Sequence, residues 1–227
     1  MKILALETSG FGGSACVASE GVTLAEQGIP SSMRSAKGLA PTIARTLELA
    51  GCSMSDIGVV AVTQGPGSFT GLRVGVTTAK VIAYARKIEL IGVDTLAVIA
   101  RQVPARDSRY WVVMDALRSQ LYVGLFHRDA EGSVTQRSPT ELVDIDPWLQ
   151  RRNDDPVAGP GVSCVQGRLP SDAILGVEED WQPRASSVAQ LAWKLHLAGK
   201  QIEPFAFTPD YYRPSYAEEP KAPPPSG

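Results

Sequence analysis

Two short turns in the first third of the sequence carry residue types that often contact phosphate groups. The first, Glu7-Thr8-Ser9-Gly10, follows an apolar run at 3–6, and the second, at 65–71, reads Gly-Pro-Gly-Ser-Phe-Thr-Gly. Glycine lets the backbone approach a ligand closely, and N–H groups at the start of a helix attract anions. The candidate phosphate-binding residues are therefore Thr8, Ser9, Gly65, Gly67, Ser68 and Thr70.

Neither turn matches an established nucleotide-binding motif. The second turn lacks the Lys-Ser or Lys-Thr pair of a Walker loop, and its glycines do not have the dinucleotide-binding spacing. Glu7 has a carboxylate of the kind that holds a hydrated magnesium ion. A tight strand-to-helix turn at 65–71 and a plain hairpin turn at 7–10 explain the same glycines without a ligand. From the residues alone, both interpretations stay open.

Other kinds of site are judged by what the sequence lacks. The two histidines, His127 and His196, have no second histidine at helical spacing, and the three cysteines are scattered at 16, 52 and 164. The sequence also contains no Cys-x-x-Cys pair and no Gly-x-Ser-x-Gly nucleophile motif. These absences predict no catalytic residue and no metal site.

The elements that must position the two turns alternate between strand and helix. Apolar runs predict strands, and spacings of three and four residues predict helices. The predicted strands of the first part are 3–6, 14–18, 22–25, 57–63 and 90–93, and its predicted helices cover about 39–50, 72–87 and 95–102. Because a glycine-rich turn separates a strand from a helix at 65–71, we predict an α/β fold.

A second set of strands, at 111–115 and 121–126, repeats the pattern of the first. Asp115 ends an apolar strand before a turn, as Glu7 does, which suggests two related lobes but does not exclude coincidence. The last predicted helix covers 187–198. The predicted domains are an N-terminal lobe at 1–104, a smaller C-terminal lobe at 105–216 and a disordered tail at 217–227, which is rich in proline.

Two predicted helices each carry a stripe of small residues. Gly75, Ala79 and Ala83 recur every four residues, and the earlier helix has alanines at 36, 40 and 44. Small side chains let another helix approach the backbone closely. Such stripes pack either inside their own domain or against a partner subunit, and the spacing does not distinguish these cases.

The composition is that of an ordinary globular protein. Apolar residues make up 44% and charged residues 20% of the 227 positions, and the formal net charge is −2. Because phosphate contacts supply most of the affinity for nucleic acid, this balance predicts that any nucleic-acid contact runs through a partner. No apolar run is long enough for a signal peptide or a membrane span, so we predict a cytoplasmic protein that does not contact membranes.

Several segments resemble the TsaB family, the bacterial tRNA threonylcarbamoyladenosine biosynthesis proteins of the glycoprotease superfamily. They are Ile-Leu-Ala-Leu-Glu-Thr-Ser at 3–9, Gly-Pro-Gly-Ser-Phe-Thr-Gly-Leu-Arg-Val-Gly at 65–75 and Gly-Val-Asp-Thr-Leu at 92–96. Asp115-Ala116 with Arg118 and Tyr122 resembles the family's second-lobe turn, and 211–213 resembles its Tyr-Leu-Arg segment. The resemblance covers residues 1 to about 215. It implies the actin-like, sugar-kinase-like (ASKHA) fold of two related lobes.

The resemblance also implies a function. Such a subunit is a non-catalytic scaffold that docks on the catalytic paralogue TsaD and helps to recruit the ATPase TsaE, and it meets tRNA only through the complex. TsaD carries a His-x-x-x-His metal pair on its first long helix, whereas 33–41 of this chain contains no histidine. No cofactor of its own is expected, and weak nucleotide binding stays open.

The resemblance further favours the interface interpretation of the small-residue stripes. In relatives, the two helices of the first lobe contact the partner or a second copy of the same chain, as a homodimer. The predicted interface residues are Leu39, Ile43, Leu47, Leu72, Gly75, Val76, Ala79 and Ala83. Two other functions stay open: an ATP-dependent small-molecule kinase of the same fold and, with less support, a peptidase of the superfamily.

Overall fold

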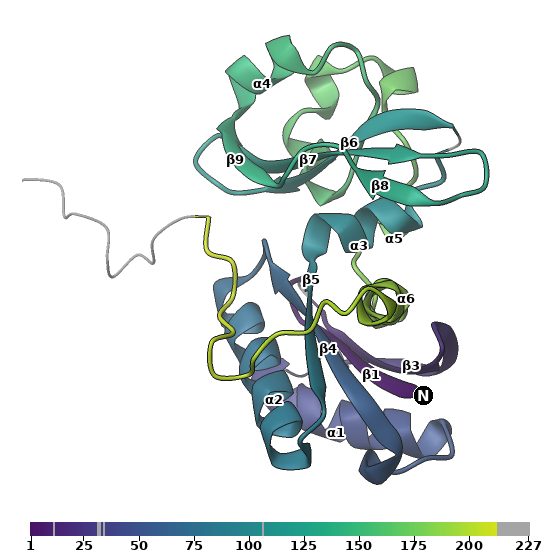
Figure 1. Ribbon diagram of the computed structural model, residues 1–227. Coiled ribbons are helices and arrows are strands. Elements are labelled where there is room, and N and C mark those ends of the chain that lie inside the picture. Colours follow the sequence, from purple (N-terminus) through teal and green to yellow (C-terminus); the bar gives the residue numbers. More distant parts are fainter. Residues whose placement is uncertain (11, 31–32, 34, 106, 213–227) are drawn as a thin grey trace, which may run out of the picture.

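The computed structural model describes residues 1–10, 12–30, 33, 35–105 and 107–212, and it contains two lobes with helix α3 (Thr95–Gln102) between them (Figure 1). The first lobe is built on a five-stranded sheet of order β3-β2-β1-β4-β5. Strand β1 pairs antiparallel with β2 and parallel with β4. The strands are β1 (Lys2–Glu7), β2 (Ser14–Ser19), β3 (Val22–Gly28), β4 (Ile57–Gly65) and β5 (Glu89–Asp94).

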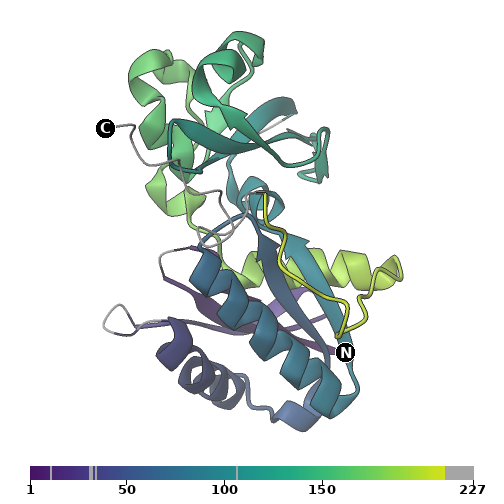
Figure 2. The ribbon, with the colours of Figure 1, turned by 90° about the vertical axis from the view of Figure 1, so that its left-hand side faces the viewer.

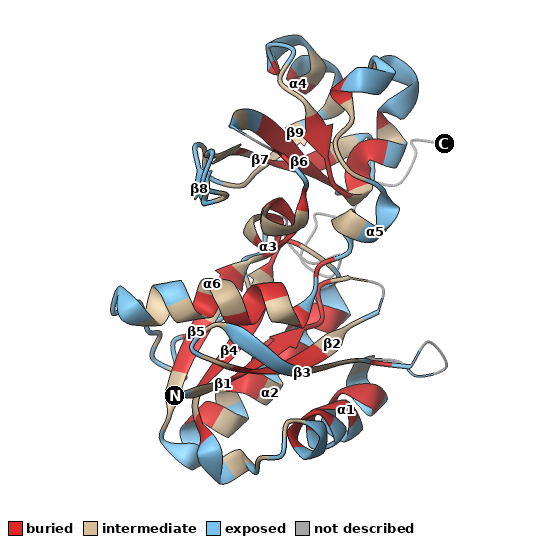
Figure 3. Ribbon diagram, turned by 90° about the vertical axis from the view of Figure 1, so that its right-hand side faces the viewer, coloured by how far each residue is buried: buried red, intermediate tan, exposed pale blue. Residues whose placement is uncertain are grey.

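Both faces of this sheet are covered by helices (Figure 3). Alternate residues of β1 point to opposite faces, so Leu4 and Leu6 pack with helices α1 and α2, and Ile3 and Ala5 pack with helix α6. Strand β4 is buried on both faces, which explains its nearly continuous run of apolar residues. The helices are α1 (Ser35–Leu49), α2 (Phe69–Arg86) and α6 (Ala185–Leu197).

Local sequence signals set the limits of these helices. Ser68 is the N-cap of α2, and its hydroxyl oxygen accepts the backbone N–H of Gly71 at 3.3 Å. Lys87 ends the helix in the left-handed conformation. Pro41 lies in the second turn of α1, where it is exposed, so water can reach the carbonyl group that the missing N–H leaves without a partner.

The second lobe has its own sheet, of order β10-β6-β7-β8, with β9 also paired to β7. Its largest buried side chains include Tyr110, Phe126 and Trp148. The strands are β6 (Ser108–Asp115), β7 (Gln120–Arg128), β8 (Val134–Gln136), β9 (Glu141–Asp144) and β10 (Val157–Ala158). The α-helices are α4 (Ile145–Arg151) and α5 (Glu178–Trp181). The described residues also form short 3-10 helices, η1 (Met54–Asp56) in the first lobe and η2 (Pro160–Cys164), η3 (Gln166–Arg168) and η4 (Ser171–Ala173) in the second.

The two lobes repeat one arrangement. In each, the strand that ends in a carboxylate pairs antiparallel with the next strand and parallel with a later one: β1 with β2 and β4, and β6 with β7 and β10. The prediction of an α/β fold with two related lobes, the second smaller, is confirmed.

The end of the chain returns to the first lobe. Helix α6 packs on the first sheet, and Ile202 then donates its N–H to the Leu90 carbonyl oxygen at 2.9 Å. The segment continues beside α2, where Lys80 Nζ donates to the Phe207 carbonyl oxygen at 2.8 Å (Figure 2). The predicted division into 1–104 and 105–216 therefore does not follow the packing, because residues 185–212 complete the first lobe. The predicted disordered tail at 217–227 lies outside the described residues.

None of the helices in the described part of the chain has both the length and the apolar character needed to cross a bilayer.

Candidate functional site

The structure brings the two glycine-rich turns together. Ser68 donates its N–H to the Ser9 carbonyl oxygen at 2.8 Å. A Cβ atom on Gly67 would lie 2.6 Å from that same oxygen, and one on Gly71 would overlap the carbonyl oxygen of Thr8. A Cβ atom on Gly75 would overlap the Thr8 hydroxyl. Three glycines of the second turn and its helix are therefore needed for the close approach of the first turn.

The backbone N–H groups of Thr8 and Ser9 in the first turn are bonded within the protein. Thr8 donates its N–H to Thr63 Oγ1 at 3.4 Å, and Ser9 donates its N–H to Glu7 Oε1 at 2.6 Å. The Ser9 hydroxyl also contacts Glu7 Oε1. Thr8 is fully buried, and its Oγ1 has no hydrogen-bond partner among the described residues. The close packing of the two turns thus explains their glycines without a ligand. Phosphate binding by the turns stays a prediction.

Glu7 is a buried carboxylate at the centre of this arrangement. It is only 1% exposed, and burial raises its pKa from 4.5 to about 7, although hydrogen bonds from Ser9 and Gly10 oppose the shift. A group with this pKa changes charge near neutral pH.

A cavity of about 460 Å³ opens beside Glu7, between the first turn and the segment before α6. Its lining includes the carboxyl groups of Glu7 and Glu26 together with a single arginine, Arg184. Two carboxyl groups disfavour an anionic ligand here. Among the described residues, no three His, Cys, Asp or Glu side chains are grouped so that they could hold a metal ion.

A second carboxylate, Asp94 at the end of β5, connects the lobes. Its Oδ1 accepts the N–H of Ala97 at 2.9 Å and so caps α3, and its Oδ2 accepts the hydroxyl of Thr140 from the second lobe at 2.8 Å. Burial raises the pKa of Asp94 to about 6, and the nearby Asp210 adds to the shift. Asp210 is itself held by Gln64, whose Nε2 donates to Asp210 Oδ2 at 2.7 Å.

Tyr212 adds an aromatic contact between the lobes. Its ring centroid lies 5.6 Å from that of Tyr122 on β7, and burial together with Asp94 and Asp210 raises its pKa to about 12. Asp94, Thr140 and Tyr212 were not among the site residues predicted from the sequence. The role of Asp94 as an N-cap could have been predicted, because it is an acidic residue directly before a helix. For Thr140 and Tyr212 no local signal exists, because their contacts form only on folding.

The turn between β6 and β7 has an unusual backbone. Leu117, Arg118 and Ser119 have φ values of 61°, 53° and 57°, a left-handed conformation that non-glycine residues rarely adopt in succession. Asp115 stabilises the turn, since its Oδ1 accepts the N–H of Leu117 at 2.7 Å. This is the segment that resembles the family's Asp-Ala-Arg turn, and its conformation marks it as a place of stored strain.

The predicted interface residues are buried inside this chain. Seven of them are at most 8% exposed, and all of these except Leu72 belong to the apolar cluster between α1, α2 and the first sheet: Leu39, Ile43, Leu47, Leu72, Val76, Ala79 and Ala83. Gly75, the eighth, is buried against Thr8. The prediction that this face is open to a partner is therefore corrected. The small residues are needed for close packing of α2 on its own sheet.

The opposite side of α2 carries exposed apolar and aromatic groups. Tyr84 and Val81 are 62% and 60% exposed, and Tyr84 packs edge-on against Phe205, with ring centroids 4.9 Å apart. At the start of the helix, the Phe69 ring lies 5.1 Å from that of Tyr211. We call these five residues the α2 strip. The second small-residue stripe, at Ala36, Ala40 and Ala44 of α1, is exposed as well.

The comparisons with known proteins agree with this fold. The sequence pattern of the family described as "TsaD: tRNA N6-adenosine threonylcarbamoyltransferase" matches residues 30–144, about half of the chain. The chain therefore belongs to the TsaD family.

Its similarity to TsaB proteins extends over nearly the full length. The chain is 27% identical to a tRNA threonylcarbamoyladenosine biosynthesis protein TsaB of Bacillus subtilis and 26% identical to that of Escherichia coli, with 96% of each chain covered in both cases. A solved structure, YeaZ from Pseudomonas aeruginosa, superposes with a TM-score of 0.78 at 24% identity, covering 92% of this chain and 99% of the other. The resemblance to TsaB and the predicted fold class are thus confirmed.

Proposed function

We propose that this protein is the non-catalytic subunit of a complex that makes threonylcarbamoyladenosine in tRNA, and that it docks on a TsaD-type transferase. The observation that carries the proposal is the match to TsaB proteins along 96% of both chains. The name of these proteins assigns them to threonylcarbamoyladenosine biosynthesis. Recruitment of a TsaE-type ATPase and contact with tRNA through the assembled complex are part of the same proposal, as is a cytoplasmic location.

The non-catalytic role is supported by the first long helix. In TsaD this helix carries the metal-binding histidine pair, whereas the two histidines of this chain are His127 on β7 and His196 on α6. His196 is engaged with Glu89, with 2.6 Å between Nδ1 and Oε2. A metal-dependent transfer at the position used in TsaD would therefore have no imidazole ligands here.

We place the docking surface on the α2 strip and the neighbouring exposed side of α1. The α2 strip is apolar and aromatic, and solvent-exposed groups of this kind are enriched where a partner covers them. Alanines 36, 40 and 44 let a partner helix approach α1 closely. A second copy of this chain would use the same surface in the absence of the transferase.

Replacing Val81 by Asp tests this surface. Val81 is 60% exposed, so Val81→Asp should leave the melting temperature nearly unchanged. At a covered interface the unpaired carboxylate would be desolvated, and the affinity for the TsaD-family transferase of the same organism should fall by at least about 10-fold. The measurement is calorimetric titration of the two purified proteins.

Val22→Asp is the matched control, because Val22 is 67% exposed but lies on the edge strand β3, away from α2. It should bind the transferase like the wild type. Wild-type affinity of Val81→Asp would refute the proposed surface. Failure of the wild-type protein to bind the transferase would refute the proposed function itself.

A further inference from the structure

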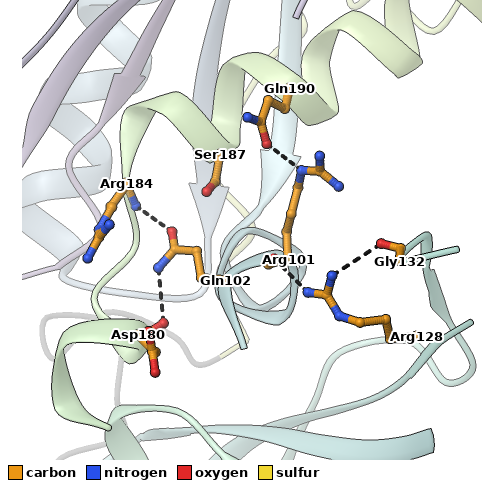
Figure 4. Close-up of a pocket in the computed structure, with 8 residues that line it drawn as sticks. All are labelled: Arg101, Gln102, Arg128, Gly132, Asp180, Arg184, Ser187 and Gln190. Carbon is orange, nitrogen blue, oxygen red and sulfur yellow. Dashed lines mark hydrogen bonds between the residues drawn. The ribbon is translucent and has the colours of Figure 1, made fainter. Parts of the chain in front are cut away.

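A pocket of about 280 Å³ lies between the lobes, where α3, β7 and the start of α6 meet (Figure 4). Arginines from three elements line it: Arg101 on α3, Arg128 on β7 and Arg184 directly before α6. Neutral polar groups complete the lining, among them Gln190 and Ser187. We call this the arginine pocket.

Arg128 is held rigidly at the end of α3. Its Nη2 donates to the carbonyl oxygens of Ala100, Arg101 and Val103 at 3.2, 2.7 and 2.9 Å, and its Nη1 donates to that of Gly132 at 3.1 Å. These bonds fix the positive charge in place. They offset it only in part, because the acceptors at the C-terminal end of α3 carry a partial negative charge and none of them is a carboxylate.

Arg101 lies beside Arg128 and is also held by a neutral group. Its Nε donates to Gln190 Oε1 at 2.5 Å. Burial, and then the positive charge of Arg128, lower the pKa of Arg101 from its usual value. In the part of the chain that the structure describes, neither guanidinium group has a carboxylate within the 4.0 Å of an ion pair.

The one acidic residue of the lining, Asp180, forms hydrogen bonds with neutral groups. The carboxylate of Asp180 accepts the N–H of Val177 at 3.0 Å, at the start of α5, while its carbonyl oxygen accepts Gln102 Nε2 at 3.0 Å. In Figure 4 the Ser187 hydroxyl points into the space between Gln102 and Arg101. The lining thus carries three guanidinium groups, a hydroxyl group and one carboxylate, that of Asp180, which forms no ion pair with Arg101 or Arg128 among the described residues.

We propose that the arginine pocket binds a phosphate group. Guanidinium groups match phosphate in geometry and charge, and an anion would relieve the repulsion between Arg101 and Arg128. The volume is just below the roughly 300–1,000 Å³ of pockets for larger organic ligands, which suits a phosphate or a small monophosphate. The cavity beside Glu7 has the opposite character, with two carboxyl groups. This proposal is independent of the proposed function.

Binding of inorganic phosphate to the wild-type protein is the first test. We expect a saturable titration that shifts the side-chain NMR signals of Arg101 and Arg128. Arg101→Gln should weaken binding by at least about 10-fold, because a charge-assisted hydrogen bond is lost. Arg86→Gln is the control, since it makes the same charge change on α2, on the opposite face of the first sheet, and should leave binding unchanged.

Three results would overturn the proposal: no saturable binding, shifts confined to other residues, or equal affinity in wild type and Arg101→Gln. Because the NMR titration uses the wild type, it remains decisive even if a variant folds poorly. The source of the phosphate is identified by comparing AMP with a short single-stranded RNA. Tighter binding of AMP indicates a free monophosphate, and tighter, salt-sensitive binding of RNA indicates a phosphodiester.

Discussion

The buried carboxyl group of Glu7 should make the stability of this protein depend on pH. Its pKa rises from 4.5 to about 7 in the folded state because burial disfavours the charged form. Below pH 4.5 the group is protonated in both states and costs nothing. Above pH 7 it is charged in both states, and the folded protein bears the cost of the buried charge. The free energy of unfolding should therefore fall as the pH rises from 4.5 to 7.

A shift of this size corresponds to about 3 kcal/mol, at roughly 1.36 kcal/mol per pKa unit. The Glu7→Gln variant removes the titration but keeps an oxygen that accepts from Ser9. Denaturant unfolding followed by circular dichroism gives the free energy of unfolding of both proteins between pH 4.5 and 8. The difference, variant minus wild type, should increase by about 3 kcal/mol across this range. Other titrating groups, Asp94 among them, contribute to both proteins and cancel.

Glu131→Gln serves as the control, because Glu131 is exposed in the turn before β8. The Glu7→Gln difference should change with pH more than the Glu131→Gln difference does. A Glu7→Gln difference that stays flat with pH would refute the reasoning, since it would mean that Glu7 is as easily charged in the folded protein as in the unfolded one. A difference that decreases with pH would mean that the charged form is the one stabilised.

Two further predictions concern the packing of α2. Gly71→Ala should lower the free energy of unfolding by about 1–3 kcal/mol, because the new methyl group overlaps the Thr8 carbonyl oxygen. Gly167→Ala, with nothing within 4 Å of the new methyl group, should change it little in the same denaturation assay. Ala79→Trp should lower the melting temperature and the yield of folded protein, because Ala79 is fully buried; normal melting of this variant would contradict the observed position of α2 on the sheet.

Much of the fold was predictable from short stretches of sequence. The strands around residues 3–6 and 57–63 are apolar because they are covered on both faces, and a buried strand of this kind has a strong local signal. The turn at 65–71 and the helix after it also have a local signal. Ser68 caps the helix through a hydrogen bond with Gly71, which is only three residues further along the chain. Periodicity also identified correctly that Gly75, Ala79 and Ala83 share one face of α2.

The sequence by itself determined the order of the elements, which residues share a face of each element, and the family. Each of these depends on local patterns or on whole motifs. Only the tertiary structure decided what covers each face. A stripe of small residues has the same spacing whether a sheet or a partner lies against it, so the burial of Ala79 and the exposure of Val81 required the packed chain. The packing of α6 on the first sheet and the proximity of Arg101 to Arg128 likewise could not be predicted from the sequence. They join segments that are distant in sequence, and such contacts exist only after the chain has folded.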